Sequence, residues 1–292
     1  MRVRAVRKEK SGELDTAEWV DRTRDPYADG DTLWVPVIGS EPCDREIPER
    51  SRYRGRGYYL VGDIAVLHGK EPTQAEIDAI AGFCHPHGIL WIKSLQDITR
   101  TPETQVVWGS CGDVCHKEAG FSYILDPEKV MFSMGNREEK ARLVRMVHNS
   151  PCPERIADMF AGIGYFAIPL AGAGGTVHAM EINPVAYRYL VRSIEANGLS
   201  GRITPSCGDC RQLITGIYDR IVMGHFDAVT MLPDALRHAA NGTTLHVHSI
   251  GPAVEQVRAH VEGAGFSATI HVHKVKKYRP HAWHVVQDVH LT

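Results

Sequence analysis

The sequence lacks the long apolar runs that membrane spans and export signals require. No stretch of about eighteen or more apolar residues appears. The basic, polar start Met1-Arg2-Val3-Arg4 is not followed by the apolar core of a signal peptide. With 43% hydrophobic and 23% charged residues, the composition is typical of a soluble globular protein. We therefore expect a cytoplasmic location.

Paired cysteines are also lacking. Seven cysteines, an odd number in a chain without an export signal, predict free thiols rather than a disulfide framework. Residue types that bind zinc do occur between positions 84 and 116, namely Cys84, His85, His87, Cys111, Cys115 and His116. Their spacing is not that of a zinc site, because Cys111 and Cys115 have no second matched pair and Cys84 lies far upstream. We expect no metal.

The chain has no strong excess of charge of either sign, since its formal net charge is -2. Two short segments are nevertheless basic, one with Arg45, Arg50, Arg52, Arg54 and Arg56, the other with Lys274, Lys276, Lys277 and Arg279. The aromatic residues among them are Tyr53, Tyr58, Tyr59 and Tyr278. A solvated face is one interpretation. Contact with RNA is the other, because arginines can bind phosphates and tyrosine rings can stack on bases.

The sequence pattern divides the chain into three parts. Residues 1–55 are rich in charge, Pro and Gly and predict a small strand-bearing or loop-rich segment, with one apolar run at 32–38. Residues 56–150 predict a small α+β module that contacts RNA, with a connecting helix. Its expected elements are one buried strand over 58–67, a helix at 72–84, strands at 88–93, 106–109 and 121–125, and a helix at 136–149.

Residues 151–292 alternate between strand and helix patterns. Strands are expected at 155–160, 176–181, 203–206, 220–223 and 243–248, and helices at 166–171, 184–197, 213–217, 228–240 and 253–264. Two final runs, 267–275 and 282–290, suit an antiparallel hairpin at the sheet edge. Such alternation predicts an α/β fold with a doubly wound, Rossmann-like parallel sheet.

A glycine turn follows the first of these strands. The run Asp158-Met159-Phe160-Ala161-Gly162-Ile163-Gly164 leads from a strand into a helix, and Glu181 ends the next strand. Because Gly162 and Gly164 lack a Cβ, the backbone can turn sharply and approach a ligand closely. The two carboxylate oxygens of Glu181 suit paired ribose hydroxyls. This layout predicts a site for a nucleoside cofactor.

Asp158 distinguishes between two such cofactors. Gly162, Gly164 and Ala167 also satisfy the looser dinucleotide fingerprint, so the glycines do not decide. A carboxylate four residues before the first glycine would repel a pyrophosphate but could accept hydrogen bonds from the amino end of a methionine moiety. The prediction is S-adenosylmethionine, bound by a class I S-adenosylmethionine-dependent transferase.

With these motifs in view, the chain resembles the archaeal branch of the wybutosine-synthesising tRNA aminocarboxypropyltransferases, relatives of the tRNA guanine-37 N1-methyltransferases. The shared motifs run from residue 62 to 286, and the longest is Asp158 to Phe166. The others are Gly62-Asp63-Ile64-Ala65-Val66, His116-Lys117-Glu118-Ala119-Gly120, Phe132-Ser133-Met134-Gly135-Asn136, Glu181-Ile182-Asn183-Pro184, Val222-Met223-Gly224, Lys276-Lys277-Tyr278 and Trp283-His284-Val285-Val286.

The segment after the fourth strand of the sheet separates these two families. Methyltransferases that act on a ring nitrogen commonly carry Asn-Pro-Pro or Asp-Pro-Pro there, whereas this chain has Val222-Met223-Gly224-His225-Phe226-Asp227. The resemblance therefore implies transfer of the 3-amino-3-carboxypropyl group to a carbon of 4-demethylwyosine, at position 37 in the anticodon loop of phenylalanine tRNA. The alternatives are a guanine-37 N1-methyltransferase and a non-catalytic RNA-binding protein with the same fold.

The resemblance also implies the residues around the cofactor. They are Ser133 and Lys140 before the sheet, Glu181 at the ribose, and Asp209 with Cys210 near the adenine. Lys140 stands where the family often has arginine, and Cys210 where it often has asparagine. Ser133 as a helix cap and Lys140 as a solvated helix residue are the structural alternatives. No catalytic base is assigned, although His225 and Asp227 lie where the target base should enter, and His246 and His248 end the fifth strand.

Overall fold

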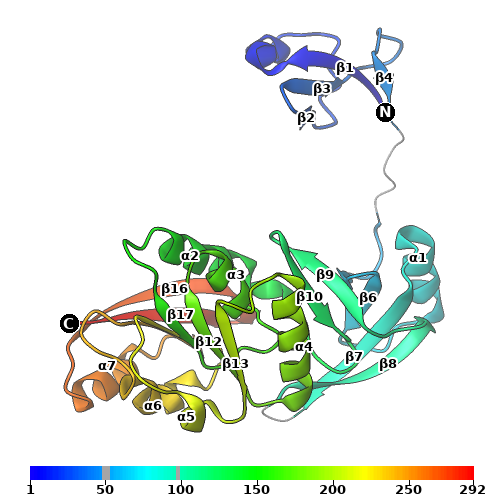
Figure 1. Ribbon diagram of the computed structural model, residues 1–292. Helices are drawn as coiled ribbons and strands as arrows, with labels where there is room; N and C mark the ends of the chain where they lie inside the picture. Colours follow the sequence, from blue (N-terminus) through cyan, green and yellow to red (C-terminus); the bar gives the residue numbers. More distant parts are fainter. Residues whose placement is uncertain (48–52, 97–98) are drawn as a thin grey trace. The chain divides into compact units, whose positions relative to one another are not determined.

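The chain folds as two units, residues 1–54 and 55–292. The computed structural model describes residues 1–47, 53–96 and 99–292 (Figure 1). Two members of the first basic segment, Arg50 and Arg52, lie outside the described residues. The boundary expected at 55 lies next to the boundary between the units, whereas the one expected at 150 falls inside the second unit and stays a prediction.

The first unit is built on a small antiparallel sheet in the order β2-β3-β1-β4. Val3 of β1 and Val35 of β3 are fully buried in it, so the apolar run at 32–38 supplies part of its core. A 3-10 helix, Lys8–Asp15, follows β1. The strands are β1 (Arg2–Arg7), β2 (Tyr27–Asp29), β3 (Thr32–Pro36) and β4 (Arg45–Glu46).

The second unit begins with an α+β layer. One sheet has the order β5-β6-β7-β8, and β9 and β10 form a separate hairpin. The helix α1 starts at a capping box in which Thr73 and Glu76 bond reciprocally. The elements are β5 (Tyr59–Val61), β6 (Ile64–His68), α1 (Gln74–Cys84), β7 (Gly88–Gln96), β8 (Thr101–Gly109), β9 (Val114–Glu118) and β10 (Phe121–Leu125).

The single strand expected over 58–67 is wrong. Gly62 adopts a positive φ of 60°, and the chain reverses there, so that Val61 pairs with Ile64 in an antiparallel β5–β6 hairpin. Such a backbone conformation is easily reached by glycine, which has no Cβ. Strand β9 was also not predicted, although exposed and buried residues alternate in it from Cys115 to Glu118.

The main sheet has the order β13-β12-β11-β14-β15-β17-β16. Strands β11 to β15 run parallel, and β17 pairs antiparallel with both β15 and β16. This confirms the predicted doubly wound sheet with its terminal hairpin. The strands are β11 (Arg155–Asp158), β12 (Thr176–Glu181), β13 (Ile203–Cys207), β14 (Arg220–Met223), β15 (Thr244–Ile250), β16 (Ala268–Arg279) and β17 (Ala282–Leu291).

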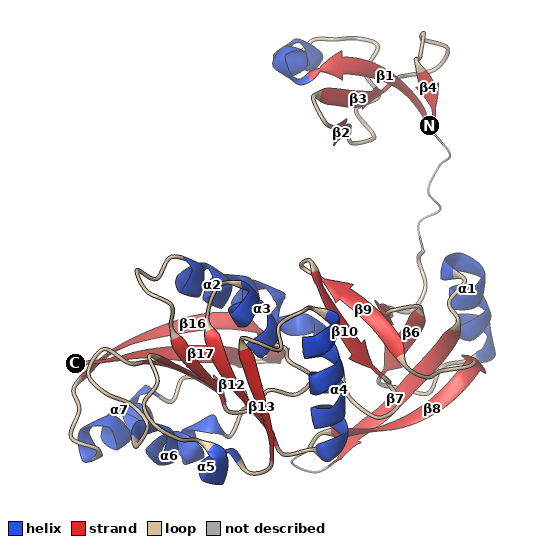
Figure 2. Cartoon of the chain, in the orientation of Figure 1, coloured by secondary structure: helices blue, strands red, loops and turns tan. Residues whose placement is uncertain are grey.

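Helices cover both faces of this sheet (Figure 2). On one face lie α2 (Arg137–His148), α3 (Ala167–Gly172) and α4 (Pro184–Ala196). On the other lie α5 (Cys210–Leu213), α6 (Leu232–Leu236) and α7 (Val254–Gly263). None of the helices in the described part of the chain is long and apolar enough to span a membrane.

Two of the expected helices are misplaced. The helix expected at 213–217 is wrong, because Asp209 caps α5 by accepting from the Arg211 N–H, and Gly216 has a positive φ of 73°. The helix expected at 228–240 is instead a 3-10 turn, Ala228–Met231, followed by the short α6. Local capping and glycine geometry therefore set the bounds of α5.

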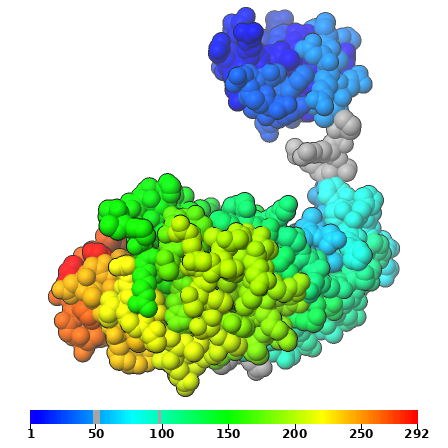
Figure 3. Space-filling view, viewed as in Figure 1, coloured from blue at the N-terminus to red at the C-terminus, as the bar shows by residue number. Residues whose placement is uncertain are grey.

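The α+β layer is attached to the main sheet through α4. The Ser122 N–H of β10 donates to the side chain of Asn197, and the Ile124 N–H donates to that of Ser193, both at 2.9 Å. The edge of β10 is thus bonded by polar side chains from the end of the helix. In the space-filling view the yellow-green segment around α4 and the green segment of β9 and β10 belong to one continuous surface (Figure 3).

Candidate active site

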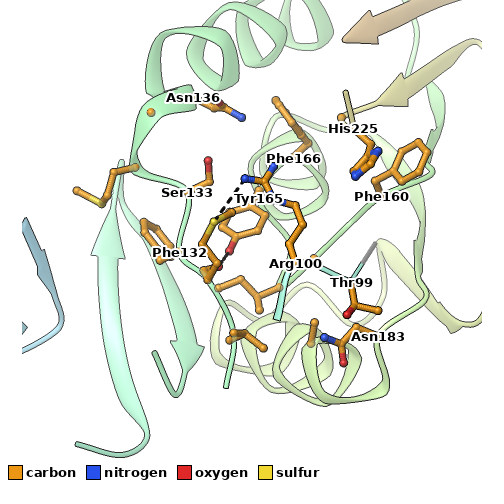
Figure 4. A pocket seen from close by; sticks show the side chains of 18 of the residues that line it. Thr99, Arg100, Phe132, Ser133, Asn136, Phe160, Tyr165, Phe166, Asn183 and His225 are labelled. Carbon is orange, nitrogen blue, oxygen red and sulfur yellow. Dashed lines mark hydrogen bonds between the residues drawn. The ribbon is translucent and has the colours of Figure 1, made fainter. Parts of the chain in front are cut away.

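A cavity of about 330 Å³ lies at the carboxyl ends of β11, β12 and β14. Gly162 follows β11, Glu181 ends β12 and Gly224 directly follows β14, and all three line the cavity. Ligands in open α/β sheets bind at this edge of the strands. Figure 4 shows Ser133, Asn136, Phe160, Phe166 and His225 around the space.

The glycine turn forms the floor of the cavity. Gly162 has a positive φ of 58°, and a Cβ added there would come within 2.5 Å of the Tyr165 ring. Gly164 has a φ of 103°, and its Cβ would meet Ile168 at 2.6 Å and Leu190 at 3.2 Å. Gly162 therefore leaves room for the Tyr165 ring beside the cavity, whereas Gly164 allows the turn to pack on α3 and α4.

Glu181 is positioned by two backbone groups. Its Oε2 accepts the N–H of Gly162 and its Oε1 accepts the N–H of Asn183, each at 2.7 Å. Asn183 in turn caps α4, and Pro184 occupies the first turn of that helix. Burial raises the pKa of Glu181, although these backbone N–H groups oppose the shift. Glu181 lines the cavity, and each of its oxygens retains a second lone pair that can accept a further hydrogen bond.

Asp158 lies beneath the turn and is fully buried. Its oxygens accept the N–H groups of Phe160 at 3.3 Å and Ala167 at 3.1 Å, so it ties the end of β11 to the start of α3. Burial raises the pKa of Asp158 to about 7. The side chain is not part of the cavity lining, and its contact with a methionine moiety stays a prediction.

Ser133 and Lys140 occupy different layers. Ser133 lines the cavity, and its side chain makes no helix-capping hydrogen bond. Lys140 is buried behind the cavity wall, hydrogen-bonded to Glu118, with its Nζ 5.7 Å from the ring centroid of Phe132 and 6.0 Å from that of Tyr165. Burial lowers the pKa of Lys140 in spite of Glu118. The structure does not bring Lys140 to the cavity.

Asp209 and Cys210 lie at the start of α5, outside the cavity lining. Asp209 bonds the backbone and the guanidinium of Arg211, while Cys210 is buried and its pKa is raised by burial to about 11. The Gly208 N–H donates to the Glu181 carbonyl, which keeps this loop beside β12. In the described part of the chain, no group of three or more His, Cys, Asp or Glu is arranged to hold a metal ion.

Most of the aromatic and basic wall of the cavity was not predicted from the sequence. Arg100 enters from the segment just before β8 and lies 5.5 Å from the centroid of the Phe226 ring. His225 stacks on Phe160 with centroids 5.4 Å apart. The remaining lining residues that were not assigned to the cofactor site include Asn136, Tyr165, Phe166, Lys276, Tyr278 and His284. All six lie in the motifs that carry the resemblance, and this was the available signal.

The cavity suits a nucleoside bearing a charged tail. Its volume lies within the range of about 300–1,000 Å³ found for small-molecule sites. The glycine turn contributes backbone to the lining, the Glu181 carboxylate contributes hydrogen-bond acceptors, and the aromatic rings offer stacking surfaces. The fold and this site define a class I S-adenosylmethionine-dependent transferase.

Comparison with known proteins specifies the class further. The model of the TRM5/TYW2 methyltransferase domain matches residues 114–275. A curated relative from Methanocaldococcus jannaschii, tRNA(Phe) (4-demethylwyosine(37)-C(7)) aminocarboxypropyltransferase, is 32% identical over 80% of this chain and 97% of its own. The chain belongs to the TRM5/TYW2 family.

Two solved structures show how far the fold extends. P. horikoshii TYW2 in complex with MeSAdo has a TM-score of 0.71 and 26% identity, covering 82% of this chain and 92% of that one. Trm5b from Pyrococcus abyssi has a TM-score of 0.76 and 24% identity, covering 99% of each chain. The second comparison concerns the fold alone, and it includes the first unit.

Proposed function

We propose that the protein transfers the 3-amino-3-carboxypropyl group of S-adenosylmethionine to C7 of 4-demethylwyosine at position 37 of tRNA(Phe), releasing methylthioadenosine. The observation that carries this proposal is the 32% identity to the M. jannaschii aminocarboxypropyltransferase over nearly the whole of that enzyme. We also propose that it acts in the cytoplasm.

The residues after β14 support this choice of reaction. Gly224 lies in the segment where ring-nitrogen methyltransferases commonly carry a proline pair, and a Cβ at this position would come within 3.1 Å of the Phe166 ring. The segment thus packs against an aromatic side chain, and His225 and Phe226 follow as further cavity lining. Such a wall suits a flat base held by stacking.

Glu181 binds the ribose hydroxyls in this proposal, and Ser133 and the Gly162 backbone contact the cofactor. When bound, S-adenosylmethionine supplies a sulfonium with three carbons open to attack, and alignment of the acceptor decides which carbon reacts. Lys140 acts from behind the wall by fixing Phe132 and Tyr165, while Asp158 holds the glycine turn. Asp209 and Cys210 border the adenine from the α5 loop.

The basic residues near the cavity support tRNA as the partner. Arg100 and Lys276 line it, together with the aromatic Tyr278. On the same hairpin, Lys274 lies over the Trp283 ring at 5.3 Å, and Lys277 is exposed. Cations beside exposed rings suit a single-stranded loop, in which unpaired bases stack and phosphates need neutralising. We propose that this surface receives the anticodon loop and that the first unit contributes a further tRNA contact.

Product analysis tests the proposal. The protein is incubated with S-adenosylmethionine and tRNA that carries 4-demethylwyosine, and mass spectrometry identifies both the nucleoside and the sulfur product. Methylthioadenosine and an aminocarboxypropylated base are expected. The same tRNA with unmodified guanine at this position is the control. S-adenosylhomocysteine from either tRNA, without methylthioadenosine, would establish a methyltransferase instead.

A further inference from the structure

Two buried histidines face each other across strands β15 and β17. His248 and His284 are each only 1% exposed, and Nδ1 of His248 lies 2.9 Å from Nε2 of His284. Their other ring nitrogens, Nε2 of His248 and Nδ1 of His284, are buried and have no hydrogen-bond partner among the described residues. Buried polar atoms are nearly always bonded in native proteins, so such an exception calls for an explanation.

The sheet order places His284 at the acceptor end of the cavity. His284 lies near the start of β17 and pairs with Ile250 at the carboxyl end of antiparallel β15. It lines the cavity, whereas His248 does not. The order β12-β11-β14-β15-β17 separates Glu181 from His284 by four strand spacings, about 19 Å at the usual distance between strands. The two residues thus serve opposite ends of the site.

The surroundings of His284 favour a neutral ring. Its neighbours are the Phe226 ring, edge-on with centroids 5.1 Å apart, His248 on β15, Lys276 on β16 and Arg100 before β8. Burial, and then the positive charges of Lys276 and Arg100, lower the pKa of His284 to about 4. Burial lowers the pKa of His248 well below its usual value as well. At neutral pH the pair therefore shares one hydrogen bond between two neutral imidazoles.

We propose that His284 is the catalytic base of the reaction, and that its Nδ1 takes the proton from C7 of the acceptor base. This inference rests on the proposed function. The Nε2–H of His284 donates to Nδ1 of His248. This hydrogen bond fixes the tautomer in which Nδ1 of His284 keeps its lone pair. His248 is the positioning residue. His284 lines the cavity, and the acceptor base would supply the partner that its Nδ1 lacks.

The step balances as follows in atoms and charge. The ring electrons of C7 form the new C–C bond to the γ-carbon of the methionine moiety, and the C–S bond breaks with its electron pair going to sulfur, which becomes neutral. The C7–H bond breaks, its electrons restore the ring, and the proton goes to Nδ1 of His284. The imidazolium returns this proton to water when the products leave.

Two substitutions at His284 separate proton transfer from hydrogen bonding. H284Q keeps an amide near Nε2, in reach of His248, but removes the acceptor at Nδ1. H284N places an amide oxygen near Nδ1, which accepts a hydrogen bond but takes no proton. Both are expected to lower the single-turnover rate about 100-fold, the lower range for general acid–base catalysis. The exposed His271→Gln on β16 is the matched control and should react at the native rate.

The assay is methylthioadenosine release at saturating S-adenosylmethionine, with cofactor affinity and melting temperature measured for each variant. Deuterium at C7 of the tRNA base should slow H284Q more than the native enzyme, because proton removal has become the slow step. A native rate in H284N would show that His284 acts only as a hydrogen-bond acceptor. A native rate in both variants would show that His284 has no role in the reaction. Both results overturn the proposal.

The native enzyme provides the remaining tests. If it released no methylthioadenosine, the proposed function would fail before any variant was compared. If neither variant folded, the pH dependence of the native single-turnover rate would decide. This rate should fall as the pH is lowered toward about 4, where His284 becomes protonated. A rate that stayed constant from neutrality down to that pH would overturn the proposal.

Discussion

Replacing Asp158 with asparagine tests how burial acts on the carboxylate beneath the glycine turn. Its pKa is raised from 3.8 to about 7, chiefly because the side chain is fully buried, while the N–H groups of Phe160 and Ala167 oppose the shift only in part. Well below the ordinary pKa of 3.8 the carboxyl is protonated in both the folded and the unfolded chain. Between pH 4 and 7 the unfolded chain loses this proton first, so the free energy of unfolding falls as the pH rises.

The magnitude follows from the two pKa values. Each pH unit in this window is worth about 1.4 kcal/mol, so Asp158 lowers the free energy of unfolding by about 4 kcal/mol between pH 4 and 7, after which its contribution is constant. The amide introduced by D158N does not ionise, so the variant lacks this slope.

Urea unfolding of the native protein and of D158N across this range measures the difference between their free energies of unfolding. The contributions of the other titrating groups cancel in this difference. A difference that did not change with pH would refute the reasoning. If Asp158 also contacts the amino group of the cofactor, S-adenosylmethionine should bind the native protein more tightly as the pH rises through 7, and D158N should not show this trend.

Three further predictions concern the walls of the cavity. E181A should weaken S-adenosylmethionine binding roughly 10- to 100-fold, the value of a charge-assisted hydrogen bond, and an unchanged dissociation constant in calorimetry would contradict the ribose role. E118A should lower the free energy of unfolding by about 3–5 kcal/mol, because it leaves the Lys140 ammonium buried without its partner. The double variant E118L/K140M should lose much less free energy of unfolding than E118A. Equal losses for the two variants in urea unfolding would argue against a buried ion pair. G224A should slow methylthioadenosine release about 10-fold with cofactor affinity retained, because the new Cβ displaces Phe166 in the part of the cavity wall proposed to hold the acceptor base. An unchanged rate would contradict this geometry.

Much of the main sheet was predictable, because its strands are short buried apolar runs between helical patterns. The strands at 176–181 and 220–223 were predicted at the residues where the structure has them. Errors arose where one residue overrides the pattern. Gly62 turns an apparently continuous strand into a hairpin, and Asp209 starts α5 earlier than its apolar residues suggest.

The site was predictable only where its residues follow one another in a motif. Gly162 and Glu181 were found because each ends or follows a strand, and they line the cavity as expected. Arg100, Phe226 and His284 come from three separate regions, and only the strand order brings them together. Lys140 shows what a motif position does not reveal, namely that Glu118 holds its side chain behind the cavity wall; its contact with the cofactor stays a prediction.

The hydrogen bonds from α4 to β10 have a consequence for how this chain can be divided. A fragment that ended at residue 150 would lose Ser193 and Asn197, and the N–H groups of Ser122 and Ile124 would become an open strand edge. Exposed edges pair readily with other chains and lead to aggregation. The α+β layer therefore cannot be transferred to another protein by itself. Recombination or protein engineering would have to move it together with α4, whose side chains bond the edge of β10.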